Sequence, residues 1–341
     1  MAMLRACGAL VLVATLTANL MGGEIDPRVK KATTKGLDWL VQSQNRQGYW
    51  TAVGQPYPVA MTSLSGMAMI AEGSTTTQGK YAESIRKSVD FLVLQSRKNG
   101  LIGDPLKDDR YTYGHGFAML FLSQVLGEEE DEERRDVLLD VLVRAVHFTC
   151  LAQDPSGGWG YVSAKDNNGK DEGSTTITQV QGLRACRNAG IPVPKEPIDK
   201  AIAYIKNCTT PEGGVLYRPG HPGVRPPISA AAIACLFNAG AYDTEYVPKL
   251  MSFCKRSGEL KASVPATAHF HYGQYYWCQV LYREGGRDWE NHRDTLYRRL
   301  VNEQDPKDGS WNQSYVGPVY TTATNLTILQ LEKANLPIYQ R

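Results

Sequence analysis

A short pattern of glutamine, three residues, glycine, one residue and tryptophan recurs along this 341-residue chain. Two copies are complete, QNRQGYW from Gln44 to Trp50 and QDPSGGW from Gln153 to Trp159. A third, QDPKDGSW from Gln304 to Trp311, has one extra residue before its glycine. A motif that returns at multiples of one interval is typical of repeat proteins. The pattern therefore predicts a series of similar units rather than one unrepeated core.

The spacing of the three tryptophans indicates where further copies belong. Trp50, Trp159 and Trp311 are separated by two and three periods of about 50 residues. Weaker copies occur where this period predicts them: QSRKNGLIGD at 95–104, NCTTPEGGVLY at 207–217 and CKRSGEL at 254–260. The chain is therefore expected to contain six repeats.

Every copy lies between two segments with helical periodicity, in which apolar residues recur three and four positions apart. The first segment carries charged residues on one face, as in VKKATTKGLDWLVQSQ at 29–44. The second is rich in small residues and Met, as in MTSLSGMAMIAEG at 61–73. The pattern predicts an all-α fold of six helix pairs, with charged helices outside and small-residue helices inside. An open solenoid fits the period too, but six pairs favour a closed (α/α)6 toroid.

The motif itself has a structural interpretation. Its Gln can donate to the unpaired carbonyls at the end of the preceding outer helix, and its Gly permits the positive φ that reverses the chain. Its Trp can fill the wedge between neighbouring pairs. The motif is therefore expected to join repeats and gives no direct information on catalysis.

The N-terminus resembles a targeting segment. Arg5 precedes an apolar run that is too short to span a bilayer comfortably. We expect a signal peptide at 1–23 and one mature domain at 24–341, which predicts an exported protein, periplasmic or secreted. No A-x-A triplet precedes Glu24, so an uncleaved anchor is the alternative.

Composition excludes some classes of partner and site. Lys and Arg number 37 against 35 Asp and Glu, so the net charge of +2 provides no basic field for nucleic acid. The six cysteines after the leader form no C-x-x-C pair and lie in apolar helical stretches, which predicts buried free thiols rather than disulfides or zinc ligands. Neither a cofactor nor a metal is indicated, and the oligomeric state is left open.

With these motifs in place, the chain resembles the terpenoid cyclase and protein prenyltransferase superfamily, whose members repeat a Q-x-x-x-G-x-W element on an α/α toroid. The resemblance extends from about Val29 to Asn335. It implies a deep central cavity that is lined by the inner helices and often receives an isoprenoid.

The chemical signatures of that superfamily are missing. The D-x-D-D acid of squalene-hopene cyclases is not matched, since the adjacent aspartates Asp108 and Asp109 stand in DPLKDDRY. The D-x-C zinc pair of prenyltransferases, the C-G-E-Q of thioester domains and the D-D-x-x-D of terpene synthases are also absent. The resemblance thus carries over a fold and no functional residue.

Polar and aromatic side chains instead gather where inner helices are expected to begin, in YTYGHGF at 111–117, KDEGSTT at 170–176 and HFHYGQYYW at 269–277. Imidazole and carboxyl groups can act as acids and bases near neutral pH. The candidate catalytic residues are His115, Asp171, Glu172 and His271. The candidate ligand-binding residues are Tyr113, His269, Tyr272, Tyr275, Tyr276 and Trp277. Equally, these side chains can cap helix ends and pack in the core.

A separate stretch, RPGHPGVRPP at 218–227, reads as a stiff turn whose Arg218, His221 and Arg225 can border the cavity and attract a carboxylate. Three functions remain open on these residues. The first is binding of an isoprenoid-like or other extended ligand, with peripheral membrane association compatible with it. The second is polysaccharide lyase or hydrolase chemistry on a glycan by the His and Asp/Glu residues. The third is a non-catalytic scaffold in the cell envelope, in which side chains would fill the cavity.

Overall fold

The computed structural model describes residues 26–167, 171–242 and 245–340. The predicted signal peptide, residues 1–23, lies outside the described residues. The described residues form α-helices and short 3₁₀ helices, with isolated β-bridges and no strand among them. The all-α prediction is confirmed.

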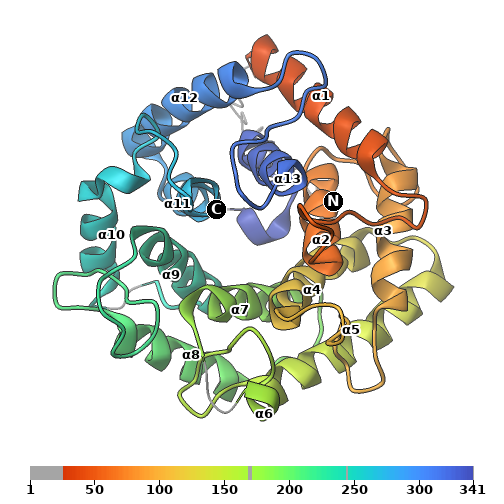
Figure 1. Ribbon diagram of the computed structural model, residues 1–341. Helices are drawn as coiled ribbons and strands as arrows, with labels where there is room; N and C mark the ends of the chain where they lie inside the picture. Colours follow the sequence, from red (N-terminus) through yellow and green to blue (C-terminus); the bar gives the residue numbers. More distant parts are fainter. Residues whose placement is uncertain (1–25, 168–170, 243–244, 341) are drawn as a thin grey trace, which may run out of the picture.

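The helices form two concentric layers (Figure 1). The outer helices are α1 (Pro27–Ser43), α3 (Ala82–Leu94), α5 (Glu132–Ala152), α8 (Lys195–Cys208), α10 (Val247–Arg256) and α12 (Gly286–Glu303). The inner helices are α2 (Pro58–Ile70), α4 (Tyr111–Glu128), α7 (Gly173–Asn188), α9 (Pro226–Ala239), α11 (Phe270–Glu284) and α13 (Pro318–Leu329). Short elements are α6 (Ala164–Asn167), η1 (Gly258–Leu260), η2 (Leu331–Lys333) and η3 (Pro337–Tyr339).

The two layers differ in burial as the composition predicts. Outer helix α1 buries one stripe, which includes Val29, Leu37 and Leu40, and exposes its charged face. Inner helix α2 is buried nearly all round. Small residues make this possible, because a Cβ on Gly66 would lie 2.5 Å from the Phe121 ring of α4. Inner helices therefore pack closely side by side.

The ring closes. Helix α13 packs against α2, and outer helix α12 packs against α1, so the last repeat meets the first. The Gln304 Nε2 donates to the Ala32 carbonyl of α1 at 2.8 Å. The same kind of contact that joins consecutive repeats thus joins the two ends of the chain.

The motif glutamine makes a different bond from the predicted one. In the third repeat the Nε2 of Gln153 donates to the Gly157 carbonyl in its own turn and to the Pro197 carbonyl in α8, each at 2.9 Å. The expectation that it bonds the end of its own helix is wrong. That role belongs to Trp159, whose indole N–H donates to the Thr149 carbonyl, one of the last four in α5, at 2.8 Å. The glutamine instead reaches forward to the next outer helix.

The predicted roles of the glycine and of tryptophan packing are confirmed. Gly48, Gly157 and Gly309 have φ of 87°, 97° and 86°. The backbone of the next outer helix passes close to each, since a Cβ on Gly157 would lie 2.3 Å from the Lys200 carbonyl oxygen. The tryptophans Trp50, Trp159 and Trp311 are buried. The junction therefore needs glycine for two reasons, conformation and space.

The end of the ring at which the inner helices terminate is closed by the chain itself. The C-terminal segment enters the ring (Figure 1), where the Tyr339 and Tyr275 hydroxyls lie 2.5 Å apart and the Ile338 N–H donates to Gln124 of α4. We call residues 334–340 the C-terminal plug. It leaves the opposite end as the accessible one.

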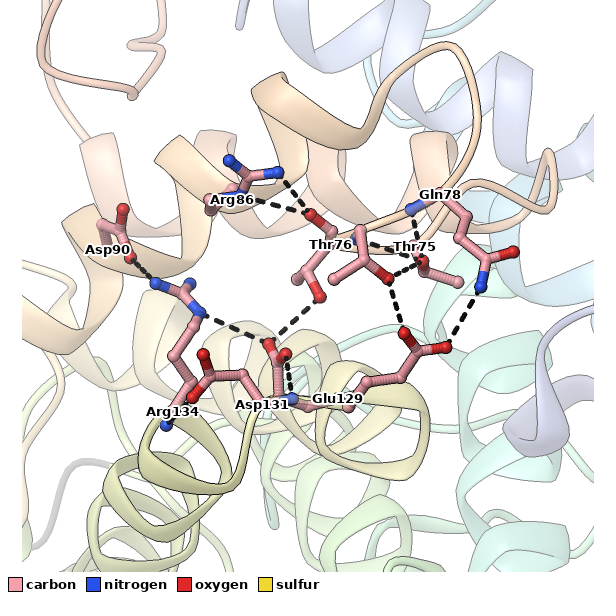
Figure 2. A network of polar contacts seen from close by, with 10 residues as sticks. Thr75, Thr76, Gln78, Arg86, Asp90, Glu129, Asp131 and Arg134 are labelled. Carbon is pink, nitrogen blue, oxygen red and sulfur yellow. Dashed lines mark hydrogen bonds and ion pairs between the residues drawn. The ribbon is translucent and has the colours of Figure 1, made fainter.

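Loops at this closed end are tied together by the polar network in Figure 2. The buried Glu129, after α4, accepts from the Thr76 hydroxyl at 3.0 Å and pairs with Arg134 of α5 at 3.4 Å. Arg134 also pairs with Asp90 of α3 at 2.9 Å. These contacts connect the second and third repeats independently of the motif.

The cysteines Cys150, Cys186, Cys208, Cys235, Cys254 and Cys278 are free, and all but Cys150 are fully buried. Burial raises the pKa of Cys186 to about 12, so this thiol is unreactive at neutral pH. No helix in the described part of the chain is long and apolar enough to cross a membrane.

Substituting the junction glycine tests the close approach. Gly157→Ala should destabilise the fold more than Gly190→Ala, because Gly190 has a similar φ of 85° but no atom within 4 Å of a Cβ. The control should lose about 1 kcal/mol from φ alone. The Gly157 variant should lose about 2 kcal/mol more in urea unfolding. Equal losses would contradict the steric part of the junction.

Candidate ligand-binding cavity

A cavity of about 610 Å³ opens where the inner helices begin. All six inner helices contribute to it, through their first two turns: Ala60, Met61 and Leu64 of α2, Tyr113 and Phe117 of α4, Ser174 of α7, Ile228 of α9, Tyr272 of α11 and Tyr320 of α13. A volume of this size is in the range of small-molecule sites. The closed ring and the plug therefore produce a cavity with one accessible end.

The inner part of the wall is apolar. Four of its side chains come from the helices and are buried, with exposed fractions of 2% to 8%: Met61, Leu64, Phe117 and Ile228. Their burial beneath the mouth places apolar surface where a ligand would be removed from water. Such a wall favours a ligand with a substantial hydrocarbon part.

Polar and charged groups lie instead on the loops that precede the inner helices. Arg110 and Arg225 are exposed and border the cavity, together with His221, His269 and Glu259. They form the mouth. The cavity is thus apolar inside and charged at its opening.

Tyrosines are the commonest side chains in the wall: Tyr57, Tyr113, Tyr161, Tyr217, Tyr272, Tyr315 and Tyr320. Each presents an apolar ring and one hydroxyl, so it can contact hydrocarbon and also bind an oxygen atom. Their number makes the wall amphipathic rather than purely apolar.

One side of the mouth is pre-ordered by stacked groups. The Arg110 guanidinium lies 4.5 Å from the centre of the Tyr161 ring. The Tyr161 hydroxyl meets the Tyr217 hydroxyl at 2.7 Å, and the Tyr217 ring packs edge-on against His221. These contacts join three loops. It holds a cation at the edge of the cavity.

Asp108 lies beside that cation and is buried. Its carboxylate accepts the backbone N–H of Arg110 at 2.8 Å. Burial raises the pKa of this carboxyl group, and the N–H opposes the rise. Its contact indicates a structural role at the start of α4.

The structure divides the predicted ligand-binding residues into two sets. Tyr113, His269 and Tyr272 line the cavity. Tyr275, Tyr276 and Trp277 do not. A helix turns by about 100° per residue, so Tyr275 and Trp277 point away from Tyr272 into the packing between helices, and the expectation for these two is corrected. Tyr276 lies one turn beyond Tyr272 on nearly the same face, with its ring 4.9 Å from the Tyr272 ring.

His115 lies at a repeat junction and does not line the cavity. In the complete repeats the backbone N–H of the tryptophan donates to a threonine hydroxyl on the inner helix, as Trp50 does to Thr62 at 3.2 Å. In the second repeat the Ile102 N–H donates to His115 Nδ1 at 3.0 Å, so histidine takes the place of threonine. Its Nε2 lies 3.0 Å from the Thr149 hydroxyl of α5. Its contacts are those of a junction residue.

The acidic pair also makes structural contacts. Glu172 is the N-cap of α7 and accepts from the backbone N–H and hydroxyl groups of Ser174 and Thr175. Burial raises its pKa, and these donors oppose the rise. Asp171 accepts from the Ser156 hydroxyl at 2.6 Å, within the preceding turn. Neither carboxylate lines the cavity.

His271 is buried between α11 and α13, where its Nδ1 lies 3.1 Å from Asn325 Oδ1. Burial lowers its pKa. It bonds toward α13, whereas His115 bonds toward α5. The four candidate catalytic residues are therefore not assembled around one space.

Several wall residues were not selected from the sequence. Of the three polar residues suggested on the 218–227 turn, His221 and Arg225 line the cavity and Arg218 does not. Arg110, Tyr161 and Tyr320 were missed. Arg110 directly precedes the YTYGHGF segment, and this position is the sequence feature that could identify it. Tyr161 lies in a turn that has no such feature.

No known family model matches the chain. It is 24% identical over 201 residues to drimenyl diphosphate synthase from Streptomyces showdoensis, a match that covers 58% of this chain. The chain spans about a third of that relative's length, the match covering 34% of it.

Solved structures with the same architecture extend the comparison. The type II terpene cyclase MstE from Scytonema, without ligand, matches at a TM-score of 0.61 and 14% identity, over 91% of this chain and 99% of that one. The unsaturated glucuronyl hydrolase from Bacillus sp. GL1 matches at 0.63 and 14% identity, over 91% and 98%. The chain thus has a terpene cyclase-like α/α-toroid fold, as its sequence resemblance implied. That fold also occurs in a glycan-degrading enzyme.

Acid stability should report the buried, neutral state of His115. Burial lowers the pKa of His115 to about 4, against 6.5 in an unfolded chain. The unfolded state therefore binds the proton first, and the free energy of unfolding falls as the pH drops from 6.5 toward 4. His115 alone accounts for about 3 kcal/mol of this loss.

The matched variant is His115→Thr, which restores the hydroxyl of the complete repeats. It should be less stable than wild type at pH 7 and approach wild type near pH 4, when both are unfolded in urea across this range. Parallel pH profiles for the two proteins would show that His115 is not a buried neutral group.

Proposed function

We propose that this protein binds one extended, isoprenoid-like ligand in the central cavity, with an anionic group of the ligand at the mouth. The observation that carries the proposal is the division of the wall, with buried Leu64, Met61 and Phe117 inside and exposed Arg110 and Arg225 at the opening. A ligand with a hydrocarbon body and a charged end matches both parts.

The structural relatives support a ligand of this class. A variant of MstE has been solved with geranylgeranyl dihydroxybenzoate as substrate, and it matches this chain at a TM-score of 0.58 and 14% identity, over 91% of this chain and 98% of that one. Another has been solved with merosterolic acid A as product. Those molecules belong to that enzyme. They show that a toroid of this kind accommodates an extended terpenoid.

The charge at the mouth selects for an anion. Arg110 and Arg225 are cationic at every physiological pH. The N-termini of the inner helices also face the cavity, and their unpaired N–H groups add positive potential. His221 contributes an unpartnered Nδ1 within the described part of the chain. Carboxylate or phosphate groups satisfy such donors best.

Catalysis is less well supported than binding. Among the described residues, the carboxyl groups that line the cavity are Asp108 and Glu259. Asp108 bonds the backbone at the start of α4, and Glu259 belongs to the mouth. The proposal is therefore binding without protonation of the ligand. Cleavage of a glycan would need the candidate catalytic residues around one space, which they do not surround. A scaffold would need a cavity filled by side chains, whereas this cavity has a volume of about 610 Å³.

Export belongs to the proposal as well. The leader pattern at 1–23 and the mature domain at 24–341 are inferences from the sequence. Val224 and Tyr315 are exposed at the mouth, which suits delivery of a lipid from a membrane surface. Cell fractionation with N-terminal sequencing tests this part directly.

Titration calorimetry with geranylgeranyl diphosphate and geranylgeraniol tests the proposed site. Wild type should bind both, the diphosphate more tightly. Arg110→Met and Arg225→Met should each weaken the diphosphate about tenfold, in keeping with loss of a charge-assisted bond, and leave geranylgeraniol unchanged.

Arg256→Met is the matched control, because Arg256 lies in the last turn of outer helix α10, away from the cavity. It should alter neither affinity. Failure of wild type to bind either probe would contradict the proposal, as would equal losses in the control and the mouth variants.

A further inference from the structure

Two tyrosine hydroxyls at the inner wall have no partner. Tyr272 lines the cavity from the first turn of α11, and Tyr276 lies one turn further along with its ring edge-on to Tyr272 at 4.9 Å. Both hydroxyl oxygens are buried, and neither has a hydrogen-bond partner within the described part of the chain. Tyr276 as a whole is fully buried.

Neighbouring tyrosines do not share this property. Tyr161 and Tyr217 satisfy each other at 2.7 Å, and Tyr275 and Tyr339 do so at 2.5 Å. A buried hydroxyl without a partner is costly, and native structures contain few of them. Two adjacent ones, of which Tyr272 lines the cavity and Tyr276 packs directly behind it, indicate a polar group of a ligand.

Of this pair, Tyr276 lies nearer the closed end. The hydroxyl of Tyr276 interacts electrostatically with Tyr275 and with Tyr339 of the C-terminal plug. Tyr113 of α4 interacts electrostatically with both hydroxyls, and it hydrogen-bonds Ser174 of α7. We call Tyr113, Tyr272 and Tyr276 the tyrosine cluster. Tyr113 connects the cluster to the mouth, since its ring lies 6.5 Å from the Tyr161 ring on which Arg110 stacks.

The cluster stays neutral. Burial raises the pKa of all three phenols well above the usual range, and the proximity of Tyr113 raises the pKa of Tyr272 and Tyr276 further. A neutral phenol both donates and accepts a hydrogen bond. The cluster can therefore bind a hydroxyl, a carbonyl or an ether oxygen, and it gives no charge to attract a cation.

We propose that the tyrosine cluster hydrogen-bonds an oxygen atom at the buried end of the ligand. This rests on the proposed function and narrows it, because the ligand then has two polar ends: an anionic group at Arg110 and Arg225, and a neutral oxygen function at Tyr272 and Tyr276. A plain hydrocarbon tail leaves the two hydroxyls unpaired and binds less well.

The test uses lauric acid and ω-hydroxylauric acid, which differ only by a hydroxyl at the end far from the carboxylate. In a wholly apolar cavity the added hydroxyl weakens binding, because it is dehydrated without compensation. Here wild type should bind the hydroxy acid at least as tightly as lauric acid. Tyr272→Phe and Tyr276→Phe should each weaken the hydroxy acid about tenfold and leave lauric acid unchanged or tighter.

Tyr242→Phe is the control, since Tyr242 is an exposed tyrosine that does not line the cavity, and it should change neither affinity. Thermal melting of each variant verifies folding. The inference is overturned if wild type prefers lauric acid, or if the two cluster variants weaken both acids equally. Binding of neither acid would instead remove the proposed function, and the inference with it.

Discussion

The structure depends on a forward hydrogen bond from the motif glutamine to the next outer helix. In the third repeat this bond runs from Gln153 to the Pro197 carbonyl, and in the last repeat from Gln304 to the Ala32 carbonyl of the first helix. Glycine lets the two backbones touch at the same place, and the tryptophan indole pairs a carbonyl left free where the preceding helix ends. The glutamine bond occurs at three junctions, from Gln44, Gln153 and Gln304, and the glycine contact with the next outer helix occurs at five. Because these contacts fix one helix pair against the next, they set the curvature, and the curvature closes the ring.

The cavity follows from that closure. Inner helices with small residues pack side by side, their first turns converge on one end, and the C-terminal plug closes the other. Helix starts bring unpaired N–H groups and polar loops to the open end, while helix interiors supply Leu64 and Phe117 to the wall. One architectural rule therefore produces an apolar interior and a mouth that presents two arginines. The ligand proposed for this cavity matches both.

The repeat could be predicted from the sequence because its signal is periodic and local. The glycine of each copy predicts a turn, and the tryptophan predicts a buried ring. The direction of the glutamine bond could not be predicted, since it depends on which helix comes next in space. His115 shows the same limit for the site. Its place near the start of an inner helix suits a catalytic residue. Only the structure reveals that it takes the place of the threonine that accepts the backbone N–H of Trp50 in another repeat.

The most direct test of the central claim is native mass spectrometry of the mature protein isolated from its own cells, with extraction and identification of any bound molecule. The account predicts one extended, mostly hydrocarbon molecule per chain, with an acidic group at one end. A bound glycan would contradict it. So would an empty protein that also fails to take up geranylgeranyl diphosphate in the same instrument.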